Sequence, residues 1–204
     1  MKINKKKFIY LISPNKIPYS FYNNLKLVLK TGKVSFFQLR LKGYSQKKKM
    51  IIGKKIKKIC KKNNVKFIIN DDPLLALKLD ADGCHLGQKD MNIKTAKKIL
   101  GKKIIGITCH NSVNLSKKAI KAKADYIAFG AFNQSKTKKT KYVASVKILN
   151  KVKKLTKIPT VAIGGINSVN YKNLLLNNAN FLAISGYIWK NKKYKPLQAV
   201  ERLK

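Results

Sequence analysis

Acidic side chains are scarce in this chain and gather in one short segment. Seven of the 204 residues are Asp or Glu, and five of these seven lie between positions 71 and 90. The five are Asp71, Asp72, Asp80, Asp82 and Asp90. Carboxylate oxygens are the ligands that hard cations such as Mg²⁺ prefer. This segment is therefore the first candidate for a metal site.

Arginine is as scarce as the acids. The basic residues number 47, yet only Arg40 and Arg202 among them are arginines. Arg40 ends an apolar run that begins at residue 34. A guanidinium group can bind two oxygens of one phosphate, which a lysine ammonium group cannot do. The sequence therefore predicts that a phosphorylated molecule binds near Arg40.

The elements that position these residues follow a simple alternation. Short apolar runs rich in β-branched and aromatic residues alternate with segments of helical spacing, such as Ile52, Ile56 and Ile59. This order predicts a single α/β domain over residues 1–204, a (β/α)₈ TIM-type barrel. An open doubly wound sheet is the alternative, because strand number alone does not separate the two. The predicted strands are residues 8–12, 34–41, 65–70, 83–86, 103–108, 125–130, 159–164 and 180–185.

Unusual polar residues fall at the carboxyl ends of the predicted strands. In a barrel these ends form one face, on which active sites are built. Each residue alone has a second explanation as a helix cap or turn, and we expect Asp72, Asp80 and Asp82 to serve in that way. The residues at strand ends are Gln38, Arg40, Asn70, Asp71, Asp90, Thr108, His110, Gly164, Gly165, Ser185 and Gly186.

Composition narrows the class of protein. A net charge of +40 would suit a nucleic-acid-binding protein. The lysines are spread over nearly every predicted helix, however, which indicates a solvated surface and no specific nucleic-acid partner. Three cysteines without metal-type spacing predict reduced thiols and a cytoplasmic location. No run approaches the roughly 20 apolar residues of a membrane span, so we expect no membrane partner.

Six motifs, in order along nearly the whole chain, resemble thiamine-phosphate synthase. The most specific is the run Ala-Asp-Gly-Cys-His-Leu-Gly-Gln-Lys-Asp at residues 81–90. Gln-Leu-Arg-Leu-Lys at 38–42 and Thr-Lys-Lys at 137–139 are moderately specific. The other three are residues 69–72, 106–110 and 162–166.

The resemblance implies a barrel enzyme that joins hydroxymethylpyrimidine diphosphate to thiazole phosphate, forming thiamine phosphate and releasing pyrophosphate. It implies that Asp71 and Asp90 hold Mg²⁺, and it assigns catalytic roles to Arg40, Thr108 and Lys138. Thr108 stands where the family usually has Ser. The substrate-binding residues that it implies are Gln38, Leu39, Arg40, Leu41, Lys42, Asn70 and Thr108 with Lys138 for the pyrimidine diphosphate, and Ser135, Lys136, Thr137, Gly165, Ile184 and Ser185 for the thiazole phosphate.

Two alternatives remain open. A thiazole tautomerase of the same barrel superfamily would use His110 as its acid and base. The set of Arg40, Lys42, Asp71 and Asp90 disfavours it, because a tautomerase handles no diphosphate. A nucleic-acid-binding protein is favoured by charge alone. The partners expected are phosphorylated small molecules, with a homo-oligomer possible.

Overall fold

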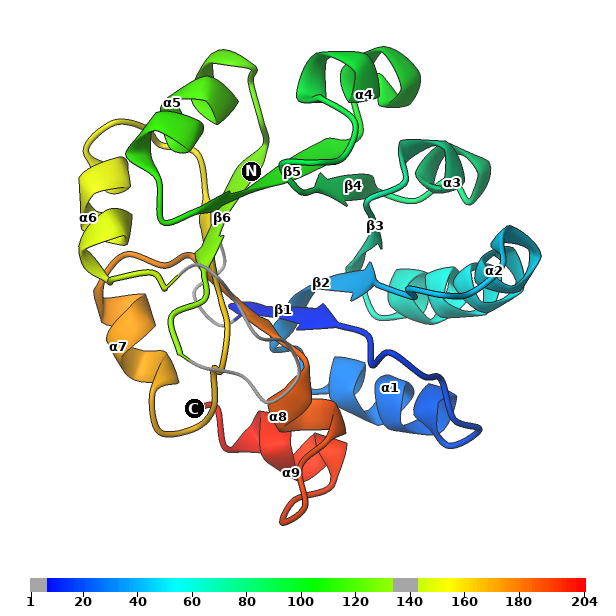
Figure 1. Cartoon of the computed structure of the whole chain (residues 1–204). Helices are drawn as coiled ribbons and strands as arrows, with labels where there is room; N and C mark the ends of the chain where they lie inside the picture. The colour runs from blue at the N-terminus through cyan, green and yellow to red at the C-terminus, as the bar shows by residue number, and fades with distance from the viewer. Residues whose placement is uncertain (1–6, 134–142) are drawn as a thin grey trace.

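The structure, a computed structural model, describes residues 7–133 and 143–204. Eight parallel strands form a closed barrel in which each strand pairs with the next and β8 pairs back with β1 (Figure 1). The predicted (β/α)₈ barrel is confirmed, and the open sheet is wrong. The strands are β1 (Ile9–Ile12), β2 (Val34–Leu39), β3 (Lys66–Asn70), β4 (Gly83–Leu86), β5 (Ile104–His110), β6 (Tyr126–Gly130), β7 (Thr160–Ile163) and β8 (Phe181–Ile184).

The helices surround the ring of strands (Figure 1). Each of the first seven strands is followed by a helix, and two helices follow β8. Each helix turns an apolar face to the barrel, as the helical spacing predicted, and the helical lysines concentrate on α2, α4, α5 and α6, whereas α8 and α9 contain none. The helices are α1 (Phe21–Lys30), α2 (Gln46–Lys62), α3 (Pro73–Lys78), α4 (Ile93–Leu100), α5 (Val113–Lys121), α6 (Lys147–Lys153), α7 (Tyr171–Leu176), α8 (Gly186–Trp189) and α9 (Pro196–Glu201).

Local sequence fixes where several helices begin. Asp72 caps α3, because its Oδ1 accepts a hydrogen bond from the Leu75 amide at 2.9 Å, and Pro73 occupies the first helical position. Asn92 and Ser112 cap α4 and α5 in the same way. The role in capping that we expected of Asp72 is therefore confirmed. The cap also sets the start of α3 directly after the end of β3, where Asp71 lies.

Two strands end two residues away from the predicted position, and β7 and β8 each end one residue early. β2 ends at Leu39, two residues early, because the Arg40 amide donates to the Ser13 hydroxyl at 2.9 Å instead of to a neighbouring strand. β5 continues two residues further, to His110, through a register shift after Thr108. His110 has a φ of 52°, which turns the chain at the end of this strand. Side-chain hydrogen bonds and bulges set both ends, and neither leaves an apolar signature.

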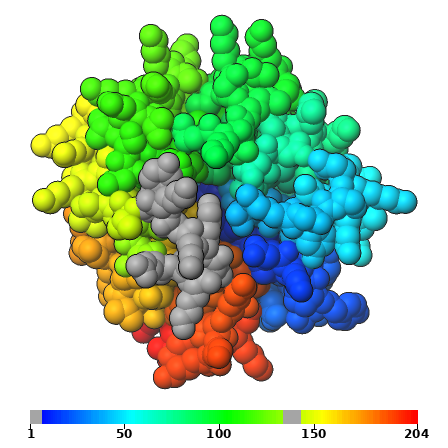
Figure 2. All heavy atoms as spheres, in the orientation of Figure 1, coloured from blue at the N-terminus to red at the C-terminus, as the bar shows by residue number. Residues whose placement is uncertain are grey.

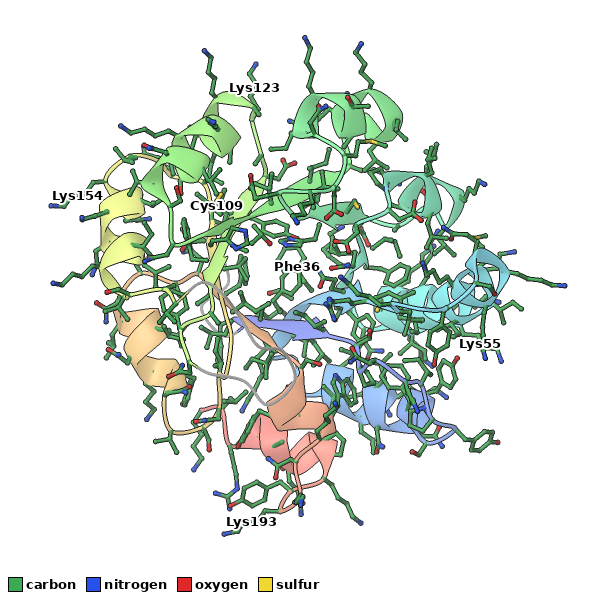
Figure 3. The ribbon with its side chains drawn as sticks, viewed as in Figure 1. Phe36, Lys55, Cys109, Lys123, Lys154 and Lys193 are labelled. Atoms are coloured by element: carbon green, nitrogen blue, oxygen red, sulfur yellow. The ribbon has the colours of Figure 1, made fainter. Side chains whose placement is uncertain are left out.

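Apolar residues form two separate packed regions. The larger lies between the strands and the helices, and the smaller fills the inside of the barrel. Phe36 points into the barrel, whereas labelled lysines such as Lys55 and Lys154 project outward (Figure 3). The interior stack is aromatic, with Tyr10, Phe36 and Tyr126 in mutual ring contact at centroid distances of 5.2 to 5.9 Å. Such a packed interior is typical of a TIM-type barrel, which is filled rather than hollow.

The amino ends of three strand pairs are joined by one repeated arrangement. The residue before β4, Asp82, donates its amide to the Phe67 carbonyl and accepts the Phe67 amide on its side chain, at 2.9 Å in both cases. Asp125 bridges to Ile105, and Asn180 bridges to Thr160, with the same pair of bonds. These residues precede β4, β6 and β8. Each therefore ties an even-numbered strand to the strand before it.

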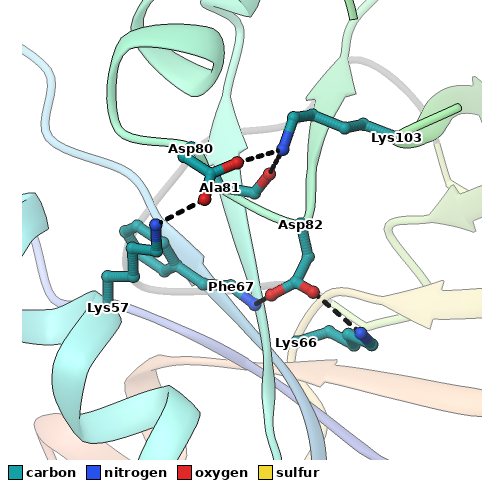
Figure 4. Close-up of polar contacts among 7 residues, drawn as sticks. All are labelled: Lys57, Lys66, Phe67, Asp80, Ala81, Asp82 and Lys103. Atoms are coloured by element: carbon teal, nitrogen blue, oxygen red, sulfur yellow. Dashed lines mark hydrogen bonds and ion pairs between the residues drawn. The ribbon is translucent and has the colours of Figure 1, made fainter. Parts of the chain in front are cut away.

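Asp80 and Asp82 also pair with lysines at this end of the barrel (Figure 4). Asp80 accepts from Lys57 at 2.8 Å and from Lys103 at 2.7 Å, and Asp82 accepts from Lys66 at 2.8 Å. The two lysines lower the pKa of Asp80 to about 2. These contacts account for two acids of the acidic segment without any metal.

Long side chains project from much of the outline of the molecule (Figure 2), and the labelled lysines in Figure 3 point outward on different sides. No described helix is long and apolar enough to cross a membrane. All three cysteines are free and buried, and burial raises the pKa of each thiol. Buried thiols of raised pKa pack as small apolar groups.

Candidate active site

A pair of carboxyl groups lies at the carboxyl ends of β3 and β4. Asp71 follows β3 in a left-handed conformation with a φ of 65°, and its amide donates to the His85 carbonyl at 2.8 Å. Asp90 lies in the loop after β4, where its Oδ2 accepts from the Gly87 amide at 2.7 Å. Eighteen residues lie between the two in sequence, yet their side chains are close enough to share a hydrogen bond. The backbone of two loops thus brings the predicted metal ligands together.

The charge balance of the pair is unfavourable without a cation. Burial raises the pKa of Asp71 to about 6, and the hydrogen bond and charge of Asp90 act in the same direction. Lys42 and Arg40 are close enough to oppose this rise in the pKa. Two adjacent carboxylates cannot both ionise without a cost that a bound cation would remove.

The residues present fit Mg²⁺. This ion usually takes one or two protein carboxylates and fills its other positions with water and substrate phosphate oxygens. The described residues contain no group of three or more His, Cys, Asp or Glu that could hold a metal. Two carboxylates can hold an Mg²⁺ ion whose other ligands include diphosphate oxygens. A zinc site made of side chains alone would need more ligands than these two carboxylates.

A cavity of about 470 Å³ opens beside the carboxyl pair. It lies between the ends of β2 and β3, the start of α3 and the loop after β4. Its walls are partly polar and partly aliphatic, as small-molecule sites generally are. Of the predicted site residues, its lining includes Leu39, Leu41, Lys42, Asn70, Asp71 and Asp90.

Ser13 connects the ends of three strands at this rim. Its hydroxyl accepts the Arg40 amide at 2.9 Å, and its carbonyl accepts the Ser185 hydroxyl at 3.2 Å. Ser13 is itself buried and follows β1 directly. The structure therefore joins two predicted site residues, Arg40 and Ser185, through a residue that the sequence analysis missed. A serine before Pro14 gives only a turn signal, so nothing in the sequence marked it.

A chain of hydrogen bonds crosses the barrel interior below the rim. Gln38 donates from Nε2 to the Tyr10 hydroxyl at 3.1 Å, and the hydroxyls of Tyr10 and Tyr126 lie 2.7 Å apart. The Tyr126 hydroxyl lies 2.9 Å from Nδ1 of His85, and Nε2 of His85 lies 2.9 Å from the Thr108 hydroxyl. The chain thus connects two predicted site residues, Gln38 and Thr108. The three central residues, Tyr10, Tyr126 and His85, were not among the predicted site residues.

Burial determines the protonation states of the residues in this hydrogen-bond chain. It lowers the pKa of His85 to about 4, so the imidazole is neutral near pH 7. It raises the pKa of Tyr10 and of Tyr126, so both phenols keep their protons. A series of neutral groups therefore supports Thr108 from below.

The rim at β7 and β8 is built from small residues. Gly164 and Gly165 have φ values of 110° and 59°, and a Cβ on Gly164 would lie 2.4 Å from the Cβ of Ala131. This conformation and close approach require glycine. Ile184 ends β8 and is buried. The remaining predicted residues, Ser135, Lys136, Thr137 and Lys138, lie outside the described part of the chain.

Comparison with known proteins identifies the family. A profile of the family described as thiamine monophosphate synthase matches residues 9–188. The chain is 68% identical to the thiamine-phosphate synthase of Pelagibacter ubique, over all of both chains. It is 39% identical to the thiamine-phosphate synthase of Erythrobacter litoralis, over 94% of this chain and 92% of that one.

A solved structure shares the fold over almost the full length. Thiamine phosphate pyrophosphorylase from Pyrococcus furiosus superposes with a TM-score of 0.86 at 28% identity, over 98% of this chain and 94% of that one. Sequence similarity and fold similarity therefore indicate the same family. The chain is a transferase that belongs to the thiamine monophosphate synthase family.

Proposed function

We propose that this enzyme catalyses the Mg²⁺-dependent condensation of hydroxymethylpyrimidine diphosphate with thiazole phosphate. The bond between the pyrimidine methylene carbon and the diphosphate oxygen breaks, and a bond from that carbon to the thiazole nitrogen forms. The products are thiamine phosphate and pyrophosphate. The observation that carries the proposal is the carboxyl pair of Asp71 and Asp90, with Arg40 and Lys42 near enough for their charges to act on Asp71 and a cavity of about 470 Å³ beside the pair.

The arrangement suits a reaction in which a diphosphate leaves. Negative charge builds up on the leaving oxygen, so fixed positive groups nearby stabilise the transition state more than the ground state. Arg40, Lys42 and Lys138 would bind the diphosphate oxygens, with Arg40 anchored through Ser13. Mg²⁺, when bound by Asp71 and Asp90, would supply Lewis-acid neutralisation of the same charge.

The substrates would be oriented by the other rim residues. Gln38 and Asn70 would hold the pyrimidine, with Leu39 and Leu41 forming the aliphatic wall. The Thr108 hydroxyl would donate to the leaving group. Gly165, Ile184, Ser185, Ser135, Lys136 and Thr137 would receive the thiazole phosphate. Holding the thiazole nitrogen close to the methylene carbon would account for much of the rate.

The test is thiamine phosphate formation from the two half-substrates, with Mg²⁺ and with EDTA. We expect Mg²⁺-dependent product from the wild type and a loss of roughly a hundredfold or more in kcat/KM for Asp71→Asn and for Arg40→Ala. Matched controls are Asp80→Asn, at the opposite end of the barrel, and Arg202→Ala, which removes the second arginine. Both controls should retain activity.

Other outcomes are equally clear. Full activity in EDTA would contradict the metal assignment while leaving the condensation intact. Absence of product from a folded protein that isomerises thiazole phosphate would contradict the condensation. That result would favour the tautomerase and direct attention to His110.

A further inference from the structure

The hydrogen-bond chain inside the barrel has a direction that its chemistry determines. Its five members come from five strands: Gln38 from β2, Tyr10 from β1, Tyr126 from β6, His85 from β4 and Thr108 from β5. Gln38, Tyr10 and Tyr126 are at most 3% exposed. A buried hydroxyl that lacks an acceptor is costly, so each proton in this chain must have a place.

The direction follows from the end at Gln38. An amide nitrogen can only donate, so Tyr10 accepts from Gln38, and its own proton must go elsewhere. In the described part of the chain the acceptor within reach is the Tyr126 hydroxyl, at 2.7 Å. Tyr126 then has its proton left for Nδ1 of His85, at 2.9 Å. A neutral imidazole that accepts at Nδ1 carries its proton on Nε2 and donates to Thr108 at 2.9 Å.

We propose that Tyr126 is a positioning residue that holds His85 as the Nε2–H tautomer, so that the Thr108 hydroxyl keeps its proton for an anionic oxygen at the barrel mouth. Thr108 accepts from His85 in this arrangement and can donate only away from it. On the proposed function, which this step assumes, the acceptor is the leaving oxygen of the diphosphate. Tyr126 and His85 contact no substrate and act through Thr108.

The packing around Tyr126 supports a fixed position. Its ring stacks on His85 with a centroid distance of 5.6 Å and an interplanar angle of 15°. A Cβ on Gly106 would lie 1.9 Å from the Tyr126 ring, so the ring occupies space that any other residue at 106 would fill. The Tyr10 and Phe36 rings also contact it, at centroid distances of 5.6 and 5.9 Å. Rotation of the phenol is therefore restricted, and its hydroxyl stays directed at His85.

The tautomer can be measured without any substrate. Two-bond proton–nitrogen correlation spectra of ¹⁵N-labelled protein show which imidazole nitrogen carries the proton. The chain has two histidines, so a His110→Gln variant assigns the signals of His85. We expect the Nε2–H tautomer in the wild type and a shift toward Nδ1–H in Tyr126→Phe. The Nδ1–H tautomer in the wild type would overturn the proposal, because the hydrogen bonds would then be donated in the opposite direction, from Thr108 toward Gln38.

Kinetics then test the link to Thr108. We expect Tyr126→Phe to lower kcat roughly tenfold with little change in KM for the diphosphate, because the lost interaction acts in the transition state. Thr108→Val should lose at least as much, and Tyr126→Phe added to it should cost little more. Thr108→Ser, which keeps the hydroxyl, should retain most activity. Additive losses in the double variant would overturn the proposal.

A matched variant separates this role from general packing. Tyr171→Phe also removes a buried tyrosine hydroxyl, which hydrogen-bonds the Lys204 carbonyl outside the barrel interior. It should lower stability without changing kcat or the His85 tautomer. An equal fall in kcat for Tyr171→Phe and Tyr126→Phe would reduce Tyr126 to a structural role. A wild type without synthase activity would contradict the proposed function, while the tautomer would still be readable.

Discussion

Titratable side chains at the two ends of the barrel meet opposite environments. Near the rim, burial and a neighbouring carboxyl raise the pKa of Asp71 to about 6, whereas at the other end two lysines lower the pKa of Asp80 to about 2. His85, below the rim, is kept neutral by burial. A perturbed carboxyl in a cavity is a typical sign of a functional site. The lowered pKa of Asp80 is what an exposed ion pair produces.

The stability of the protein should depend on pH through His85. Its pKa is about 4 in the folded state against 6.5 normally. Between these values the unfolded chain binds more protons, so the free energy of unfolding falls as the pH drops from about 6.5 to 4. The complete loss is on the order of 3 kcal/mol. Urea unfolding in EDTA at several pH values measures it.

Asp71 acts with the opposite sign in part of the same range. Its raised pKa means that the folded state binds the extra proton, so it adds stability as the pH falls from about 6 to 4. A comparison of the wild type with His85→Gln isolates the contribution of His85 to stability, because Asp71 is present in both proteins. The difference between the free energies of unfolding of the wild type and the variant should shrink toward pH 4. Parallel curves would contradict the assigned burial of His85.

Gly106 should not tolerate a side chain. A Cβ at this position would lie 1.9 Å from the Tyr126 ring, which also contacts the rings of Tyr10, Phe36 and His85. We expect Gly106→Ala to lower the free energy of unfolding by about 1 to 3 kcal/mol, measured by urea denaturation. Gly53→Ala is the control, since its Cβ would meet only the end of the Leu79 side chain. Equal effects of the two variants would contradict this account.

At the scale of elements, the strands are joined differently at the two ends of the barrel. Asp82, Asp125 and Asn180 bridge β4 to β3, β6 to β5 and β8 to β7 at the amino ends. At the carboxyl ends, Ser13 joins β1, β2 and β8. The first set repeats one pair of hydrogen bonds and keeps neighbouring strands in register. The second set positions the backbone of Arg40, which we propose binds the diphosphate.

Asn180 is the bridge whose loss should cost most. Its Oδ1 accepts the amide of Thr160, which is 1% exposed, at 2.9 Å, whereas the Thr160 hydroxyl donates to the Asn178 carbonyl at 2.8 Å. Asn180→Ala leaves the buried amide without an acceptor and should lower the free energy of unfolding by about 1 to 3 kcal/mol in urea. Asn180→Asp keeps the acceptor and should cost less. Asp125→Ala should also cost less, because Asp125 is exposed and water can replace it.

At the scale of the whole molecule, like charge should oppose folding. The net charge is +40, and three ion pairs join the residues that the structure describes. Salt screens repulsion between surface charges. We expect Tm, measured by calorimetry, to rise by about 3 °C or more between low and high NaCl, equivalent to roughly 1 kcal/mol.

A variant with fewer lysines provides the control for the salt effect. Lys55, Lys123, Lys154 and Lys193 project outward on different sides of the molecule (Figure 3). Replacing all four by Gln should raise Tm at low salt and reduce its dependence on NaCl. A Tm independent of salt in the wild type would show that the lysines are too far apart to repel one another.

The order of strands and helices, and the position of polar residues at strand ends, could be predicted from the amino-acid sequence. Both depend on residues close together in the chain, since the apolar period and the turn signals are local. For that reason the barrel was predictable, as was the presence of Gln38, Arg40, Asp71 and Thr108 on one rim. The motif at residues 81–90 indicated the protein family, and the comparisons confirm that family.

Tertiary structure alone decided which of these residues meet. Closure of β8 onto β1 and the approach of Tyr10 to Tyr126, 116 residues apart, depend on packing between distant segments. The same holds for Ser13 beneath Arg40 and for the bridges at the amino ends. The local sequence around a hydroxyl or carboxylate does not reveal which distant residue it will bind. The fold selects that partner, because a buried polar group must find one once the barrel closes.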